Sequence, residues 1–277
     1  GMELHSPDAV HLVTEAERRA YRDRAMYLGD PDYVDNHVST ITSKEYATYL
    51  RGDIKDRASR SDSLGTTGVA GFESEETTHY SIIDAEGNVA LSTTTLNGSF
   101  GSMVVVGEGG FLLNNEMDDF SIKPGVPNMY GLVGGRANAI EPGKRMLSSM
   151  TPTIVLDGDS PYILLGTPGG STIITTVAQI IMNIIDYDMD VSDAVSIQRF
   201  HHQWIPDMLV YERGAFSDET LEDLERRGHK YSEREKIIGD AQVIICRDSL
   251  RCGVSDPRGG GAAIEEIKRI SGEKGEK

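Results

Sequence analysis

Three kinds of hydrophobic pattern follow one another along this sequence, and each predicts a different element. In the first, apolar residues recur at roughly helical spacing, which is typical of the buried face of a helix. These residues are Val10, Val13, Ala16, Ala20 and Met26. Ser6-Pro7-Asp8 supplies a cap, a first-turn proline and an acid at the positive end, and Gly29-Asp30-Pro31 ends the helix. A second, short helix is predicted to begin near Thr42-Ser43, with Glu45 as a capping-box partner.

The second pattern is polar and has no period. From Asp53 to Glu76 the chain is rich in Arg, Ser, Asp and Gly, which predicts an exposed, mobile linker. At Thr77 the composition changes to β-branched and aromatic residues. We therefore divide the chain into a region 1–76 and a region 77–277.

The third pattern predicts hairpins, followed by helices. Strands are expected at 78–84 and 89–96 around the turn 85–88, at 153–156 and 162–165 around the turn 157–161, and at 243–245. A buried helix is expected at about 171–185, a short one capped by Ser192-Asp193, and an amphipathic one from Ser217 to Gly228. Hairpins and helices in separate runs favour an α+β fold, in which helices cover antiparallel sheets.

Charge and composition exclude some classes of binding partner and a membrane-spanning segment. Lys and Arg number 27 and Asp and Glu 44, which gives a net charge of −17. An acidic surface of this size repels phosphate, so nucleic acids and anionic membranes are not expected as partners. The most apolar run, Ile173 to Ile185, is shorter than the roughly 18 residues of a membrane span.

The two cysteines, Cys246 and Cys252, are too few for a disulfide framework or a four-ligand zinc site. They flank a short polar stretch and could face each other across a hairpin, although two reduced thiols are the favoured interpretation. At the amino end, Gly1 is interpreted as a tag remnant and Met2 as the start methionine, and no signal peptide is expected after them.

Candidate chemistry lies in three polar segments between predicted strands. They are 77–80, 114–120 and 147–152. A polar segment between strands is usually only a loop, so these residues alone leave both interpretations open. The glycine-rich runs 107–110 and 259–261 lack the following Lys-Ser/Thr of a phosphate-binding loop and are interpreted as turns. His201, His202 and Trp204 are interpreted as structural, because a histidine pair without nearby acids is a weak metal signal.

Taken together, eight ordered segments resemble the γ-glutamyltransferase family, from about Glu3 to Ala263. They are Thr77-Thr78-His79-Tyr80, Thr95-Leu96-Asn97, Asn114 to Phe120, Lys123 to Asn128, Leu147-Ser148-Ser149-Met150, Gly169-Gly170, Phe200 to Trp204 and Ser255-Asp256-Pro257-Arg258. The resemblance implies an N-terminal-nucleophile hydrolase fold, an αββα sandwich. Residues from Thr77 on resemble the small subunit of that family, and 1–76 resemble the end of its large subunit.

The same resemblance implies a catalytic apparatus. Autoproteolysis before Thr77 would free an α-amine that serves as base for the Thr77 hydroxyl, whereas the intact Glu76–Thr77 amide cannot accept that proton. Thr95 would hydrogen-bond the Thr77 hydroxyl. Gly169 and Gly170 would offer backbone N–H groups to the oxyanion.

Substrate-binding roles carry over by position as well. Asn97, Glu116 and Asp119 would bind the α-ammonium of a γ-glutamyl group, Ser148 and Ser149 would donate to its α-carboxylate, and Tyr130 would act as a lid. The donor would be glutathione or another γ-glutamyl compound, and the acceptor an amino acid, a peptide or water. No metal or cofactor is implied.

This sequence departs from the family in one respect. The family has a long region upstream of the position of Glu3, which this sequence does not contain. That region supplies strands of the same sandwich and an arginine that binds the substrate carboxylate. Without it the sandwich is expected to be incomplete, so that the chain needs that half as a partner or associates with itself. Two alternatives stay open: a silent truncated homologue acting as a subunit, and a related glutaryl or cephalosporin acylase. Glu116 and Asp119 favour an amino-bearing donor over the acylase substrate. Family resemblance implies a periplasmic or extracellular location, and the compartment is otherwise unknown.

Overall fold

The computed structural model describes residues 1–61, 77–247 and 250–265, and the part of the predicted linker beyond residue 61 lies outside them. The first helices are α1 (Pro7–Tyr27), α2 (Val38–Ile41) and α3 (Lys44–Asp53). Ser6 caps α1 by accepting a hydrogen bond from the Ala9 N–H, as expected. Ser43 caps α3 by accepting from the Tyr46 N–H, which puts Glu45 at the second helical residue. The predicted capping box is therefore wrong, and the single turn α2 was not foreseen.

Three sheets form. Strands β1 (Thr77–Ile83) and β2 (Val89–Thr95) make an antiparallel hairpin, which confirms the predicted one. The second sheet has the order β3-β4-β8-β9, from β3 (Thr153–Asp157), β4 (Ser160–Gly166), β8 (Gln242–Arg247) and β9 (Leu250–Ser255). The third joins β5 (Phe200–His201), β6 (Leu209–Glu212) and β7 (Tyr231–Arg234), with β6 and β7 parallel. Its strands of two to four residues are too short to leave an alternating pattern.

Helices cover one face of the four-stranded sheet. They are α4 (Ile173–Ile185) and α5 (Val191–Ser196), and their apolar side chains share a core with β4 and β8. Asp190 caps α5 rather than the predicted Ser192-Asp193, because its side chain accepts the Ser192 N–H. Helix α6 (Asp218–Arg227) packs beside α1, and it begins after Ser217 and ends at Gly228 as predicted. Gly228 has φ of 93°, which glycine adopts without strain.

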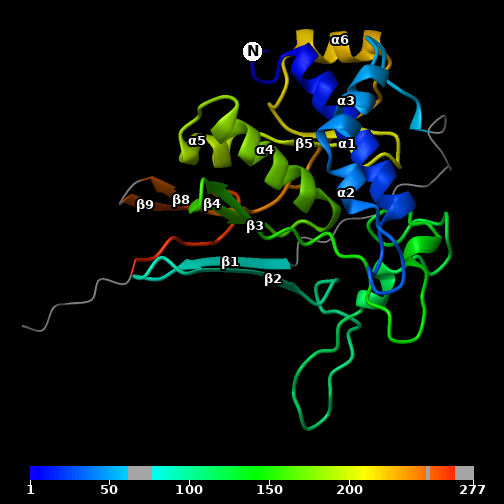
Figure 1. Cartoon of the computed structure of the whole chain (residues 1–277), viewed down its shortest axis with the longest axis vertical. Coiled ribbons are helices and arrows are strands. Elements are labelled where there is room, and N and C mark those ends of the chain that lie inside the picture. The colour runs from blue at the N-terminus through cyan, green and yellow to red at the C-terminus, as the bar shows by residue number, and fades with distance from the viewer. Residues whose placement is uncertain (62–76, 248–249, 266–277) are drawn as a thin grey trace, which may run out of the picture.

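The hairpin β1–β2 lies against the other face of the same sheet (Figure 1). Buried His79 makes the closest approach: a Cβ placed on Gly166 would lie 2.3 Å from the His79 ring. Nδ1 of His79 is 2.7 Å from Oγ1 of Thr93, and Nε2 is 3.0 Å from Oγ of Ser81. Burial lowers the pKa of His79 to about 4, so the ring is neutral near pH 7. Gly166 thus lets the hairpin that begins at Thr77 pack closely on β4.

The outward face of this hairpin carries exposed apolar side chains. Tyr80 is 49% and Ile82 55% exposed, and both alternate with the inward residues of β1. The described residues thus form a helix layer, a four-stranded sheet and a two-stranded hairpin, with the hairpin's far side uncovered (Figure 1). An apolar sheet face of this kind is typical of a surface that another element covers.

Residues 53, 55–57 and 60 are exposed, as predicted for the linker, whereas Ile54, Ala58 and Ser59 are half-buried and Ser61 is buried, so the predicted exposure is wrong at its described end. The N–H of Ser59 donates to Oε1 of Glu15 at 3.0 Å, and its hydroxyl donates to Oε2 at 2.5 Å. Ser61 is buried, and its N–H donates to the Asp207 carboxylate at 3.1 Å. The chain is therefore held at Ser59 by α1 and at Ser61 by Asp207, which precedes β6.

The two cysteines are free thiols on opposite faces of the sheet. Cys252 pairs with Ile245 across β8–β9, whereas Cys246 pairs with Arg251. Since neighbouring strand residues point to opposite faces, Cys246 and Cys252 do not face each other. The described part of the chain contains no helix with the length and hydropathy needed to cross a bilayer.

Candidate functional site

Thr77 lies at the first position of β1 and is directly opposite Thr95 at the end of β2. Both side chains belong to the face of the hairpin that also carries His79, toward the four-stranded sheet. The Thr95 hydroxyl accepts the Asn97 N–H at 2.9 Å. The register thus brings the proposed nucleophile and its proposed partner together, while Thr95 also starts the turn that follows the strand.

Asn97 is buried in a left-handed conformation, with φ of 73°. Tyr130, the expected lid residue, contacts it: the Tyr130 hydroxyl donates to the Asn97 carbonyl oxygen at 2.6 Å. The Asn97 amide nitrogen donates to the Asn115 carbonyl at 3.2 Å and lies 3.7 Å from Sδ of Met129. An amide nitrogen only donates, so Oδ1 is the side-chain atom of Asn97 that can accept a hydrogen bond from an ammonium group.

The acidic segment forms a short helix, η2 (Glu116–Asp119). Burial raises the pKa of Asp119 to about 7; the positive charge of Arg24 opposes this rise, and the charges of Glu116 and Asp118 add to it. Burial also raises the pKa of Glu116. Asp118 accepts the Met129 N–H at 2.9 Å and so holds the lid segment instead. Asp119 therefore is a carboxylate whose ionisation is costly until a cation approaches it.

One consequence is a stability effect at Asp119. Its folded pKa lies above that of the unfolded chain, so the folded state loses stability as the pH rises from about 4 to about 7. Asp119→Asn should leave the unfolding free energy unchanged at pH 4 and raise it by roughly 1–3 kcal/mol at pH 8. Urea unfolding at both pH values measures this, with Asp118→Asn as the matched control. A variant equally or less stable than wild type at pH 8 would contradict the buried-acid assignment.

The serine turn lies on the other side of the same region. Ser149 accepts a hydrogen bond from Nη2 of Arg24 at 2.9 Å, and Ser148 accepts the Met150 N–H at 3.0 Å. Because each hydroxyl oxygen already accepts one bond, its own proton can point elsewhere. Buried Asn138 links this turn to η2, since its amide donates to the Asp119 carbonyl at 2.6 Å and accepts the Leu147 N–H at 3.0 Å.

The two glycines form the turn before α4. Gly169 has φ of 134° and Gly170 has φ of 56°. A Cβ on Gly169 would lie 2.6 Å from Oγ1 of Thr172, so glycine is required for both conformation and space. The N–H groups of this turn lie at the positive end of α4. This end is a suitable place for an anion, as the oxyanion role demands.

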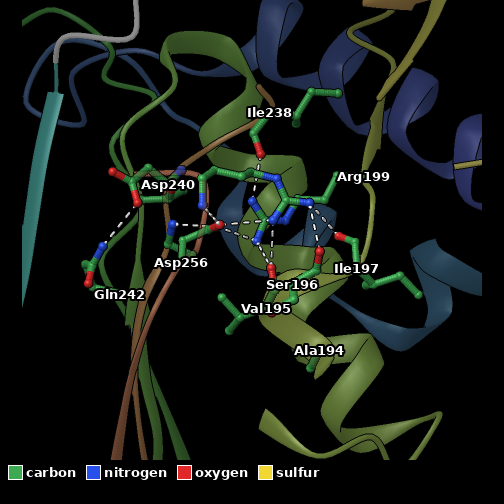
Figure 2. A network of polar contacts seen from close by, with 12 residues as sticks. Ala194, Val195, Ser196, Ile197, Arg199, Ile238, Asp240, Gln242 and Asp256 are labelled. Atoms are coloured by element: carbon green, nitrogen blue, oxygen red, sulfur yellow. Dashed lines mark hydrogen bonds and ion pairs between the residues drawn. The ribbon is translucent and has the colours of Figure 1, made fainter. Parts of the chain in front are cut away.

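A buried ion pair supports the chain behind this turn (Figure 2). Nη2 of Arg199 is 2.7 Å from Oδ2 of Asp256, and its Nη1 donates to the Ile238 carbonyl at 2.7 Å. Asp256 also accepts the Ala241 N–H at 3.0 Å. Gly239, between these two anchored positions, lies 3.5 Å from a Cβ placed on Gly169. The pair thus holds the segment on which the glycine turn rests.

The histidine pair is buried and makes polar contacts within the fold, and acids lie near it, contrary to the expectation: Nε2 of His202 is 3.4 Å from Oδ1 of Asp207, and its backbone N–H donates to Glu17 at 2.9 Å. His201 lies within 2.8 Å of both Oγ1 of Thr175 and Oε1 of Gln203. Gln203 also accepts the Ser171 hydroxyl at 2.7 Å and donates to the Tyr130 carbonyl at 3.0 Å. This glutamine therefore connects the lid with the glycine turn. Among the residues with described positions, no three His, Cys, Asp or Glu side chains form a metal-binding group.

The predicted site residues thus fall into three linked sets. The first set is joined through the hairpin and contains Thr77, Thr95, Asn97 and Tyr130. The second set lies around Arg24 and Asn138 and contains Asp119, Ser149 and Ser148. The third set is the glycine turn, Gly169 and Gly170, which Gln203 links to Tyr130. Among the residues that the structure describes, no hydrogen bond joins Thr77 directly to the acids or to the glycine turn. Sequence reasoning missed Arg24, Asn138, Gln203 and Arg199. Gln203 and Asp256 had a signal, since each belongs to a segment that carries the resemblance.

Chemically, these sets offer a hydroxyl at the start of a strand, an anion-binding helix end, and opposite charges for a zwitterion. Carboxylates suit an ammonium group, and serine hydroxyls beside an arginine suit a carboxylate. Such an arrangement fits acyl transfer from a donor whose far end is an α-amino acid.

Comparison with known proteins agrees with this chemistry. A family model described as gamma-glutamyltranspeptidase matches residues 1–266. The chain is 48% identical over 254 residues to the glutathione hydrolase proenzyme of Escherichia coli K12, which uses 91% of this chain and 44% of that protein. It therefore spans somewhat less than half of that relative's length.

Two solved structures are similar. Gamma-glutamyltranspeptidase from Pseudomonas nitroreducens complexed with L-DON shares 46% identity at a TM-score of 0.66, over 69% of this chain and 100% of that one. Cephalosporin acylase from Bacillus halodurans shares 26% identity at a TM-score of 0.75, over 93% of this chain and 45% of that one.

Proposed function

The chain belongs to the γ-glutamyltranspeptidase family, and from that premise we propose that its residues from Thr77 on carry the catalytic centre of a γ-glutamyl hydrolase and transferase. The family consists of enzymes, and the α+β fold of the N-terminal-nucleophile type is that of its solved members and of related acylases. The donor is a glutathione-like compound. One observation carries the proposal: the hairpin register sets Thr77 opposite Thr95, and Asn97, two residues after Thr95, bonds to the Asn115 carbonyl next to the acidic segment Glu116–Asp119.

The proposed reaction begins with cleavage of the Glu76–Thr77 bond, which divides the chain into 1–76 and 77–277. The freed Thr77 amine accepts the proton of the Thr77 hydroxyl as its oxygen attacks the γ-carbonyl carbon of the donor. N–H groups at Gly169 and Gly170 stabilise the resulting oxyanion. The donor C–N bond then breaks, the amine leaves with the proton, and a γ-glutamyl ester remains on Thr77. Water or an amino group of an amino acid or peptide attacks that ester and restores the hydroxyl.

The α-amino acid end of the donor defines the substrate class. Asp119, Glu116 and Oδ1 of Asn97 receive the ammonium group, and Ser148 and Ser149 donate to the carboxylate. The raised pKa of Asp119 supports this role, because an arriving cation would favour its ionised form. Tyr130, bonded to the Asn97 carbonyl, acts as the lid over the pocket.

An acylase is the second candidate, and the similarity to cephalosporin acylase over 93% of the chain favours it. A glutaryl group has no amine, so it would place a methylene against two partly buried acids. We therefore prefer the γ-glutamyl donor. Turnover of a γ-glutamyl anilide and a glutaryl anilide by the complete protein separates them, since faster turnover of the glutaryl compound would favour the acylase.

Asp119→Ala tests the ammonium site. Loss of a charge-assisted hydrogen bond costs roughly 1.5–3 kcal/mol, so KM for a γ-glutamyl anilide should rise about ten- to a hundredfold. Because Asp119 binds an atom remote from the scissile carbonyl, kcat should change much less. Steady-state kinetics measure both constants, and an unchanged KM with a collapsed kcat would contradict the role.

The exposed hairpin face supports a partner. Tyr80 and Ile82 lie on it, and we propose that the half-sandwich found in longer relatives covers them. The 277-residue polypeptide alone should then stay uncleaved at Thr77, self-associate and show little turnover, whereas addition of that half should restore processing. Mass spectrometry and light scattering test this. A monomer with a free Thr77 amino terminus and turnover above background would disprove it, and an intact, inactive chain even with that half present would favour the silent homologue.

A further inference from the structure

Arg24 is a cation that the proposed mechanism does not use, although it lies within the site. It belongs to the last turn of α1, and its Nη2 donates to Oγ of Ser149 at 2.9 Å across 125 residues of sequence. The same arginine lines one cavity together with Asp119, Asn128 and Asn138. One guanidinium therefore lies beside both a proposed carboxylate-binding serine and a proposed ammonium-binding aspartate.

We infer that Arg24 is a positioning residue for the α-amino acid end of the donor, acting through Ser149 and Asp119. This rests on the proposed function. By donating to Ser149, Arg24 occupies the hydroxyl oxygen and leaves the hydroxyl proton to the substrate carboxylate. A charge-assisted bond of this kind also polarises the hydroxyl and makes it a stronger donor.

The second action of Arg24 is on the charge of Asp119. Glu116 and Asp118, on the same short helix, oppose ionisation of Asp119, and so does burial. Arg24 on α1 is the opposing charge that acts on Asp119 from a neighbouring element. The donor ammonium needs an ionised acceptor, so removal of this cation would weaken donor binding at neutral pH.

The fold holds Arg24 in this place. One turn earlier, the Tyr21 hydroxyl donates to the Ser171 carbonyl beside the glycine turn. One residue later, the Ala25 carbonyl accepts the Gly135 N–H at 2.8 Å. The end of α1 is thus fixed on both sides, and the Arg24 side chain is aimed between the serine turn and η2. A mobile surface arginine would have no such constraint.

The first experiment measures the pKa of Asp119 and needs no substrate. Carboxyl ¹³C NMR titration, with the resonance assigned by Asp119→Asn, is carried out on the complete protein, on Arg24→Gln and on Arg24→Lys. We expect Arg24→Gln to raise this pKa by about one unit or more, and Arg24→Lys, which keeps the charge, to hold it near the wild-type value. Arg22→Gln is the matched control, because Arg22 lies on the same helix but pairs with Asp23. An unchanged pKa in Arg24→Gln overturns the inference.

The second experiment measures kinetics on a γ-glutamyl anilide from pH 6 to 9. Arg24→Gln should raise KM about fivefold at pH 7 and about tenfold at pH 6, because a pKa one unit above about 7 lowers the ionised fraction of Asp119 by these factors, and it should leave kcat within about twofold. The pH at which KM reaches its low plateau should rise by the same unit, and Arg24→Lys should reverse most of both changes. Loss of kcat at constant KM, or the same KM change in Arg22→Gln, overturns the inference. A wild-type protein that does not turn over the anilide contradicts the proposed function, while the NMR titration still decides the role of Arg24.

Discussion

Thr77→Ala in the complete protein is expected to abolish both chain cleavage and turnover. The hydroxyl is the proposed nucleophile in both reactions. In turnover, which follows cleavage, neither the neighbouring hydroxyls nor water has the freed α-amine beside it. Loss of a nucleophile that acts together with its base lowers kcat by roughly a millionfold in a well-studied serine hydrolase. We expect a loss of at least about ten-thousandfold here. Thr77→Ser should retain part of each activity, because a hydroxyl remains.

The control for this variant is Thr78→Ala. Thr78 is exposed, and its side chain points to the opposite face of β1. It should be processed and active within a fewfold of wild type. A denaturing gel shows cleavage, and release of the anilide shows turnover. A cleaved and active Thr77→Ala protein would remove Thr77 from the mechanism, whichever substrate is used.

Gly166→Ala should cause the second large loss, without touching the substrate. The added Cβ would lie 2.3 Å from two atoms of the His79 ring, which is buried and hydrogen-bonded on both sides. The ring cannot simply turn away, so the hairpin must shift. Thr77 lies two residues before His79 on this hairpin and therefore moves with it. A displacement of about 1 Å in a reacting group can cost about a hundredfold in rate. We expect kcat to fall by at least that factor.

A double variant makes this prediction specific. His79→Ala removes the ring that the new methyl group meets, so the Gly166→Ala/His79→Ala protein should be less impaired than the product of the two single effects. Gly52→Ala, on α3 with open space around its Cβ position, is the matched control and should be near neutral. Full activity in Gly166→Ala would show that the close packing of His79 on Gly166 does not position Thr77.

The helices show what neighbouring residues predict well. The starts of α1 and α6 follow from Ser6 and Ser217, whose hydroxyls accept backbone N–H groups three residues on. The predicted caps are wrong where two polar residues near a helix start could each act as the cap. Asp190 caps α5 instead of Ser192, and Ser43 caps α3 instead of Thr42. In both cases the observed helix begins one or two residues away from the predicted start. The spacing of the apolar residues does not determine the first helical residue that closely.

Ser59 and Ser61, near the described end of the predicted linker, show a different kind of error. Their polar composition predicts solvent, and Ser59 and Ser61 instead bond to Glu15 and Asp207. Polar residues can lie inside a protein when each of their groups finds a partner. Because the partners here lie 44 and 146 positions away, no pattern within the segment reveals them.

The sequence by itself determined the family, the hairpin that begins at Thr77, and the candidate residues in the eight segments that carry the resemblance. These follow from motifs and from periods of two and of 3.6 residues, which are properties of residues near one another. The tertiary structure alone decided that Arg24 reaches Ser149, that Asn138 joins the serine turn to Asp119, and that Gly166 receives His79. Each is a contact between distant segments, and its existence depends on how the helix layer, the sheet and the hairpin pack together.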